Sequence, residues 1–199
     1  MALARALAVR PQVLLLDEPL SALDAKVRVQ LRDEIKRIQS EIGITALFVT
    51  HDQEEALAVA DRVGVMRSGK LEQIGTPEEI YAKPLSGFVA DFIGVTNELP
   101  GQVVGDTATV LGQRVPLLAN SATGDVKVLV RPENIRLAAD PQGDGEVVVV
   151  AFLGALSRVQ VRLTDGSLIN AQVSVSDASA LEVGERVSVG LEPVPALAV

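Results

Sequence analysis

The stretch "LLLDEPLSALDA", residues 14 to 25, places two neighbouring carboxylates directly after an apolar run. Asp17 and Glu18 follow a predicted strand, and the carboxyl ends of strands are where parallel sheets bind ligands. One carboxylate there can hold Mg²⁺ through water while its neighbour polarises an attacking water, as phosphoryl transfer requires. The alternative is a pair of exposed acids that begin a solvated loop, because acidic side chains are mostly exposed.

The only histidine of the chain, His51, directly follows a second apolar run, "TALFVT". If the two predicted strands are parallel, its imidazole lies on the same edge as Asp17 and Glu18. There it can donate a hydrogen bond to a phosphate oxygen or orient a water. A lone histidine is usually structural or exposed, so the combination with the two acids is what favours a site.

Two further groups of polar residues have structural explanations beside chemical ones. Ser21 and Asp24, in "SALD", lie between the first strand and a long helix, where either side chain can accept from free amides as an N-cap. A cap and a functional role are compatible. Glu54 and Glu55 are expected on the first turn of a helix, where the helix dipole favours acids, and we assign them no chemistry.

The elements that position these residues alternate up to about residue 94. Residues 12–17 and 45–50 read as strands. Between them, apolar residues recur at spacings of three and four, which predicts a helix over 25–42 that stops at Gly43: Val27, Leu31, Ile35, Ile38 and Ile42. A helix in "DQEEALAVA" then leads to a strand in "RVGVMRSG" and a turn at Ser68-Gly69. This order predicts an α/β fold with a parallel sheet covered by helices.

From about residue 98 the pattern changes to short Val-, Leu- and Ile-rich strands broken by Gly and Asp turns. This pattern predicts an all-β domain, a small barrel or a pair of them. We place the boundary between Ile93 and Pro100 and divide the chain into residues 1–96 and 97–199. The first eleven residues read as the end of a helix that stops near Pro11.

Composition excludes several classes of protein. The formal net charge is −8 and acids outnumber bases in both halves, so a nucleic-acid backbone is not the expected partner. There are no cysteines, which excludes disulfides and is compatible with the cytoplasm. The longest apolar run, residues 147–156, is well short of the roughly 20 residues that a membrane-spanning helix needs.

Read in order, four segments resemble the second half of the nucleotide-binding subunit of ABC transporters: "ALARAL", "VLLLDEPLSALDA", "LFVTHDQEEALAVADRVGVMRSGKLEQIGTPEEIY" and "FVADFIG". The resemblance implies ATP and Mg²⁺ as cofactors. It implies that Asp17 is the Mg²⁺-side carboxylate of a Walker B segment and that Glu18 is the general base for ATP hydrolysis. His51 looks like the switch histidine near the γ-phosphate. Ser21 and Asp24 look like the D-loop, which belongs to the nucleotide site and reaches the facing subunit of a dimer.

The second half, through "VLVRPENIRL" and "FLGALSRVQVRLTDGSLINAQV", resembles the TOBE-type β domain of importer ATPases, which consists of OB-like barrels. The fold implied is a partial P-loop NTPase followed by that all-β domain, which serves dimer contacts or regulation and could bind a small molecule. "FVADFIGVTNELPG" looks most like the polyamine, ferric iron and sulfate branches of bacterial importers. The resemblance implies a homodimer beneath integral membrane permease subunits, on the inner face of the cell membrane. A binding protein and the membrane subunits select the transported substrate, so this sequence does not specify it.

The sequence also departs from the family. It contains no G-x-x-x-x-G-K-[ST] loop to cradle phosphates and no "LSGGQ" signature, which "MALARAL" normally follows. We therefore expect a chain that begins in mid-domain, binds ATP weakly or not at all, is inactive alone and exposes apolar strand edges. Two other functions stay open. One is a non-catalytic regulatory module in which the β domain binds a ligand; the other is a DNA-maintenance ATPase of the same class, which the acidic charge disfavours.

Overall fold

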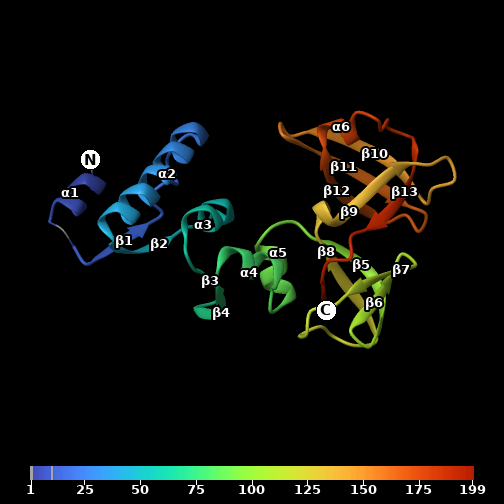
Figure 1. Cartoon of the computed structure of the whole chain (residues 1–199), viewed down its shortest axis with the longest axis horizontal. Helices are drawn as coiled ribbons and strands as arrows, with labels where there is room; N and C mark the ends of the chain where they lie inside the picture. Colours follow the sequence, from blue (N-terminus) through green and yellow to red (C-terminus); the bar gives the residue numbers. More distant parts are fainter. Residues whose placement is uncertain (1, 10) are drawn as a thin grey trace. The chain divides into compact units, whose positions relative to one another are not determined.

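The computed structural model of the chain describes residues 2–9 and 11–199, and these form two compact units, Met1–Tyr81 and Ala82–Val199. The first unit contains eight elements (Figure 1): α1 (Ala2–Ala8), β1 (Val13–Asp17), α2 (Ala25–Ile42), β2 (Thr45–Val49), α3 (Gln53–Val59), β3 (Val63–Arg67), β4 (Lys70–Gly75) and α4 (Pro77–Ala82). Within the described ranges, no helix is both long enough and apolar enough to cross a membrane.

The helix predicted over residues 25–42 is confirmed as α2 at the same bounds. Asp24 caps its first turn by accepting from the Val27 amide, and Gly43 ends it in the left-handed region at φ 68°. An L side chain would be strained at that φ, whereas glycine is not. The polar cap and the glycine thus define both ends of the helix from local sequence.

Strands β1 and β2 pair in parallel, with Leu15 opposite Leu47 and Asp17 opposite Val49. On one face of this small sheet, Leu14 is buried together with Ile35 of α2, and both line one small apolar cavity. On the other face four apolar side chains are exposed to solvent, because alternate residues of a strand point to opposite sides: Val13, Leu15, Leu47 and Val49.

The expectation that residues 62–69 add a third strand to this parallel sheet is wrong. Among the strands of the described chain, β3 pairs with β4 alone, and the two are antiparallel. Arg67 pairs with Lys70, so the predicted turn at Ser68-Gly69 is a two-residue hairpin loop, with φ of 49° and 76°. Two successive positive φ values reverse the chain tightly, which gives β3 its sequence neighbour as partner.

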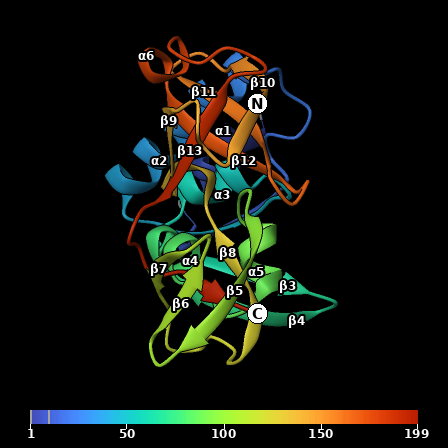
Figure 2. The same cartoon turned by 90° about the vertical axis from the view of Figure 1, so that its right-hand side faces the viewer.

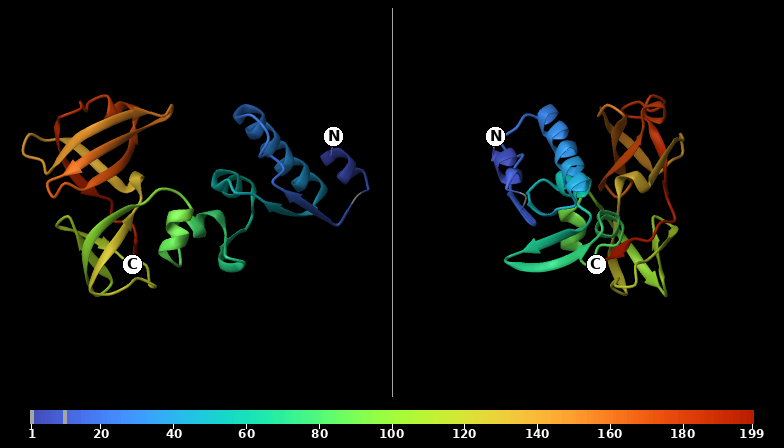
Figure 3. Two further views of the ribbon diagram at one scale, coloured as in Figure 1. Left: turned by 180° about the vertical axis from the view of Figure 1, so that it is seen from behind. Right: turned by 60° about the vertical axis from the view of Figure 1, so that its left-hand side comes forward.

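The second unit is built mainly of strands, and the all-β domain predicted for this part of the chain is confirmed (Figures 1 and 3). One five-stranded sheet has the order β14-β8-β5-β6-β7 and the other β12-β11-β10-β13-β9. The helices and strands of the second unit are α5 (Gly87–Phe92), β5 (Asn97–Val104), β6 (Thr107–Val110), β7 (Gln113–Pro116), β8 (Asp125–Val130), η1 (Pro132–Asn134), β9 (Ile135–Ala139), β10 (Gly145–Phe152), β11 (Leu156–Leu163), β12 (Leu168–Ser174), α6 (Val175–Ala178), β13 (Arg186–Leu191) and β14 (Leu197–Ala198).

Both sheets contribute to one hydrophobic core. Leu99 and Val128 of the first sheet belong to the same buried cluster as Val147 and Val161 of the second. In Figure 2 the first sheet lies below the second, and β8 leads from one toward the other. The alternation of buried and exposed residues along β10 and β11 is what a strand with one face in a core requires.

The first helix of the second unit explains why the compact units divide before residue 96. Ala90 of α5 packs in a buried cluster with Leu129 and Leu197, and Arg131 Nη1 donates to the Ala90 carbonyl oxygen at 3.0 Å. Residues 82–96 therefore pack with the β-rich part. The change in composition comes at 96/97, because α5 and its loop keep the helical character of the segments before them.

Candidate functional site

The residues singled out from the sequence lie where β1 and β2 end. The Glu18 amide donates to the carbonyl oxygen of Val49 at 2.9 Å, which extends the parallel pairing by one bond beyond β1. Glu18 itself has a φ of 45°, a region that L residues rarely occupy. Such backbone strain persists where the surrounding contacts fix it, and it is frequent at functional sites.

The structure brings Glu18 and His51 together. The Nε2 atom of His51 lies 2.8 Å from Oε1 of Glu18, which is hydrogen-bond distance. The His51 side chain is 85% exposed and that of Glu18 is 43% exposed. Both groups are therefore open to a ligand from solvent while they contact each other.

Asp17 is the last residue of β1, is exposed, and directly precedes Glu18 in the sequence. A carboxylate at a strand end has the hard oxygen atoms that Mg²⁺ prefers, so the residue suits such an ion. No group of three or more His, Asp or Glu side chains gathers around a common point in the part of the chain that the structure describes.

Ser21 and Asp24 make local contacts. The Ser21 hydroxyl donates to the Glu18 carbonyl oxygen at 3.0 Å, and Asp24 accepts from the Val27 amide at 3.1 Å. The capping alternative is therefore confirmed for Asp24, whereas Ser21 supports the loop that follows Glu18. Leu20, which directly precedes Ser21, is fully buried and anchors this loop to the first unit.

The contacts among four residues near the site, Arg28, Thr50, Asp52 and Glu55, were not predicted from the sequence. The Glu55 side chain is buried and accepts from the Thr50 hydroxyl at 2.6 Å, and Arg28 reaches Asp52 at 3.3 Å and Glu55 at 3.6 Å. Glu54 and Glu55 do lie on the first turn of α3, as expected, and Asp52 caps that turn. One feature of the sequence could have indicated these contacts: Arg28 lies one helical turn after the Asp24 cap, where several acids are near enough to pair with a cation.

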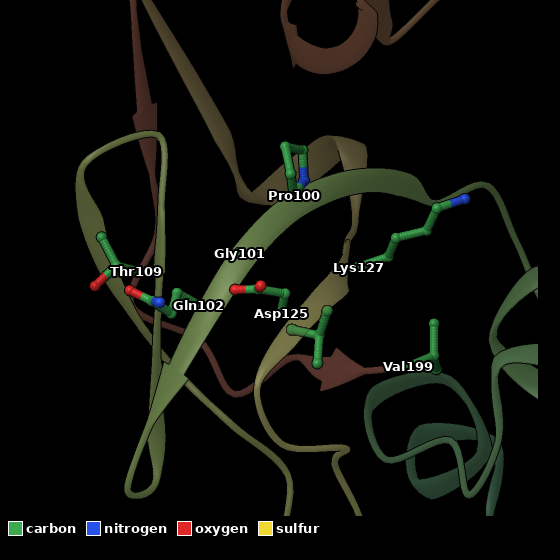
Figure 4. Close-up of a pocket in the computed structure, with 8 residues that line it drawn as sticks. Pro100, Gly101, Gln102, Thr109, Asp125, Lys127 and Val199 are labelled. Carbon is green, nitrogen blue, oxygen red and sulfur yellow. The ribbon is translucent and has the colours of Figure 1, made fainter.

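The second unit carries a shallow groove of about 590 Å³ along β5 and β8 (Figure 4). Gln102 and Asp125 line it, and Lys127 also borders it. The Lys127 Nζ lies 2.6 Å from Oε2 of Glu98, and the hydrogen bond to this carboxylate raises the pKa of Lys127. The ammonium beside the groove is therefore already paired, so the groove is not a ready anion site.

Comparison with known proteins shows which class the chain is similar to. Residues 128–198 match the model of the TOBE domain, a segment that runs from β8 to β14. The relatives match 70% to 94% of the chain and are ATP-binding proteins of bacterial import systems, so the resemblance to the ATP-binding subunits of ABC importers is confirmed.

Three of these relatives are named for the import of different solutes. A spermidine/putrescine import ATP-binding protein of Ruegeria pomeroyi is 45% identical over 203 residues, covering 94% of this chain and 54% of the relative. An Fe(3+) ions import ATP-binding protein of Rhizobium etli is 46% identical over 175 residues, covering 84% and 50%. A sulfate/thiosulfate import ATP-binding protein of Photorhabdus laumondii is 50% identical over 141 residues, covering 70% and 39%. The chain spans about half the length of the curated relatives it matches first.

Proposed function

We propose that the chain belongs to the ATP-hydrolysing, energy-coupling subunit of an ABC-type importer for a polyamine, ferric iron or a sulfate-like anion. The observation that carries the proposal is the Glu18–His51 contact at the carboxyl ends of two parallel strands. The names of the relatives support ATP as the nucleotide and import as the process.

The roles of the site residues follow from their chemistry. Bound Mg²⁺ would offset the negative charge that develops on the transferred phosphoryl group. Asp17 would hold that ion through water. Glu18 would accept a proton from the attacking water. The Nε2–H of His51, which orients the Glu18 carboxylate in this structure, would donate to a phosphate oxygen once a nucleotide is bound.

The remaining roles concern partners. Ser21 and Asp24 would form the D-loop that meets a second copy of the subunit in a homodimer, with integral membrane permease subunits above it at the inner face of the cell membrane. Residues 1–96 would be the ATPase part and residues 97–199 the regulatory part, with a place for a small-molecule ligand. The net charge of −8 argues against nucleic acid as a partner.

ATP binding by residues 1–199 alone is expected to be weak or absent. The sequence has no glycine-rich loop whose amides and lysine could hold the β- and γ-phosphates. The purified chain with Mg²⁺ and ATP should therefore show negligible turnover. Turnover that disappears on Glu18→Gln would contradict this expectation.

A fusion tests the proposed function directly. The N-terminal part of the Ruegeria pomeroyi relative, up to the start of the matched segment, would be joined to this chain. We expect Mg²⁺-dependent ATP hydrolysis that falls at least ~100-fold on Glu18→Gln, because a general base typically contributes that much. Glu54→Gln is the matched control, since Glu54 is an exposed acid on α3. A folded fusion that binds ATP without hydrolysing it, or whose hydrolysis survives Glu18→Gln, would overturn the proposal.

A further inference from the structure

One guanidinium joins the two loops that carry the candidate site. Arg28, in the first turns of α2, donates from Nη2 to the Leu23 carbonyl oxygen at 3.1 Å. Its Nη1 lies 3.3 Å from Oδ2 of Asp52, and its Nε lies 3.6 Å from Oε1 of Glu55. Leu23 belongs to the loop that follows Glu18, whereas Asp52 and Glu55 belong to the turn that follows His51. The Arg28 side chain thus contacts both segments and links them.

The turn on the His51 side has its own internal contacts. The Asp52 amide donates to the Thr50 hydroxyl at 3.0 Å, and that hydroxyl donates to Glu55 at 2.6 Å. Asp52 Oδ1 accepts from the amides of Glu54 and Glu55. These bonds hold residues 50–55 together as one turn, so a contact to Asp52 or Glu55 fixes the position of the whole turn.

The contact between Arg28 and Glu55 has an electrostatic basis. The Glu55 side chain is 5% exposed, and a buried carboxylate requires a nearby cation or several hydrogen bonds. Arg28 Nε is itself buried and has the 3.6 Å approach to Glu55 in place of a hydrogen bond. A planar guanidinium can reach three acceptors in diverging directions, whereas a lysine ammonium acts as a single point charge on a flexible stem.

We propose that Arg28 is a positioning residue, which seats the turn bearing His51 against the loop after Glu18 and so keeps the imidazole at the Glu18 carboxylate. The link to catalysis rests on the proposed function, but the geometric role does not. Arg28 acts on Glu18 and His51 indirectly, through its bonds to Leu23 and Asp52.

The single histidine provides a direct reporter. Because His51 is the only histidine, its ring protons give one set of NMR signals in the chain of residues 1–199. The experiment compares the His51 signals of Arg28→Ala and Arg28→Lys with those of Arg37→Ala, at a temperature below the unfolding transition of each variant. Arg37 is the matched control, because it pairs with Glu34 and Glu41 on the same helix and away from the site.

The expected result separates positioning from charge compensation. In Arg28→Lys the ammonium still neutralises Glu55, so stability is largely retained, but it cannot also hold Leu23 and Asp52. The His51 signals should therefore move by several line widths in both Arg28 variants and stay in place in Arg37→Ala. If Arg28→Ala does not fold, Arg28→Lys decides the question. His51 signals at their original positions in Arg28→Lys would overturn the positioning role.

The fusion described above supplies a kinetic arm. There Arg28→Lys should lower kcat roughly 10- to 100-fold with the KM for ATP nearly unchanged, because a displaced group costs rate more than binding. An unsubstituted fusion that binds ATP but does not hydrolyse it counts against the proposed function, and the NMR comparison then decides the role of Arg28 by itself. Equal falls of kcat in Arg28→Lys and Arg37→Ala would contradict the role of Arg28 in the reaction.

Discussion

The Nε2 atom of His51 lies 2.8 Å from Oε1 of Glu18, and the two residues follow different strands of one parallel pair. The contact depends on the backbone at Glu18, whose amide bonds to Val49 and whose carbonyl oxygen accepts from Ser21. Those bonds hold Glu18 at a φ of 45°. The acid is therefore presented by a strained residue and not by a relaxed loop.

Substitution at Glu18 should reveal this strain. A left-handed φ costs a residue with a Cβ roughly 1–2 kcal/mol, and glycine avoids that cost. Glu18→Gly should therefore have a free energy of unfolding about 1 kcal/mol higher than Glu18→Ala, although glycine gains more freedom in the unfolded chain. Urea unfolding of both variants measures the difference. An alanine variant as stable as the glycine variant would show that the backbone is relaxed.

The exposed face of the β1–β2 sheet should make the chain associate with itself. Leu15 and Leu47 are 70% and 58% exposed and lie opposite each other. Large apolar patches on a surface are binding or aggregation sites. The double variant Leu15→Lys, Leu47→Glu places opposite charges on that pair, and it should lower both light scattering and the fluorescence of a hydrophobic dye.

Val104→Lys is the control for that double variant, because Val104 is 69% exposed on β5 in the other unit. It removes a similar apolar side chain from a different surface. A decrease in dye binding as large as that of the double variant would show that the β1–β2 face has no special part in association.

Asn97 should be among the most sensitive polar residues of the β-rich unit. Its buried amide donates to the carbonyl oxygens of Val130 and Asn170, and its Oδ1 accepts from the Asn170 amide at 2.7 Å. Asn97→Ala would remove these partners from one buried and two partly buried backbone groups, at a cost of about 3 kcal/mol. Denaturant unfolding should show this loss. Asn120→Ala, which removes bonds from an exposed residue, should cost well under half as much.

Gly143 provides a steric test of the second sheet. A Cβ added there would lie 2.2 Å from the backbone carbonyl carbon and oxygen of Val187, and backbone atoms of a central strand cannot move aside cheaply. Gly143→Ala should therefore cost about 3 kcal/mol or more, seen as a large fall in Tm. At Gly190 the nearest atom to such a Cβ is 3.4 Å away, so Gly190→Ala should shift Tm little. Similar Tm values for the two variants would argue against this packing.

Local sequence was enough to predict the parts of the fold that depend on neighbouring residues. Asp24, the apolar spacing of α2 and Gly43 specify a helix and both its ends without help from the rest of the chain. The same holds for Ser68 and Gly69, whose left-handed conformations form a turn. Helix caps and tight turns are decided within a few residues, which is why these predictions agree with the structure.

Pairing between distant segments was harder to predict. Nothing in "RVGVMRSG" distinguishes a strand that joins a parallel sheet from one that pairs within its own hairpin, because both have the same residue pattern. The Arg28–Glu55 pair likewise depends on how α2 and α3 approach each other. Glu55 has the composition of a surface acid, and its burial is a property of tertiary packing.

The last strand of the β-rich unit bears on how the chain is made. Strand β14 pairs with β8 and completes the first sheet, and the backbones of Val199 and Lys127 exchange two more hydrogen bonds. On a ribosome, residues 97–130 emerge well before residues 197–199. A first sheet that forms during synthesis therefore has only four strands and an open edge on β8 until β14 has been made.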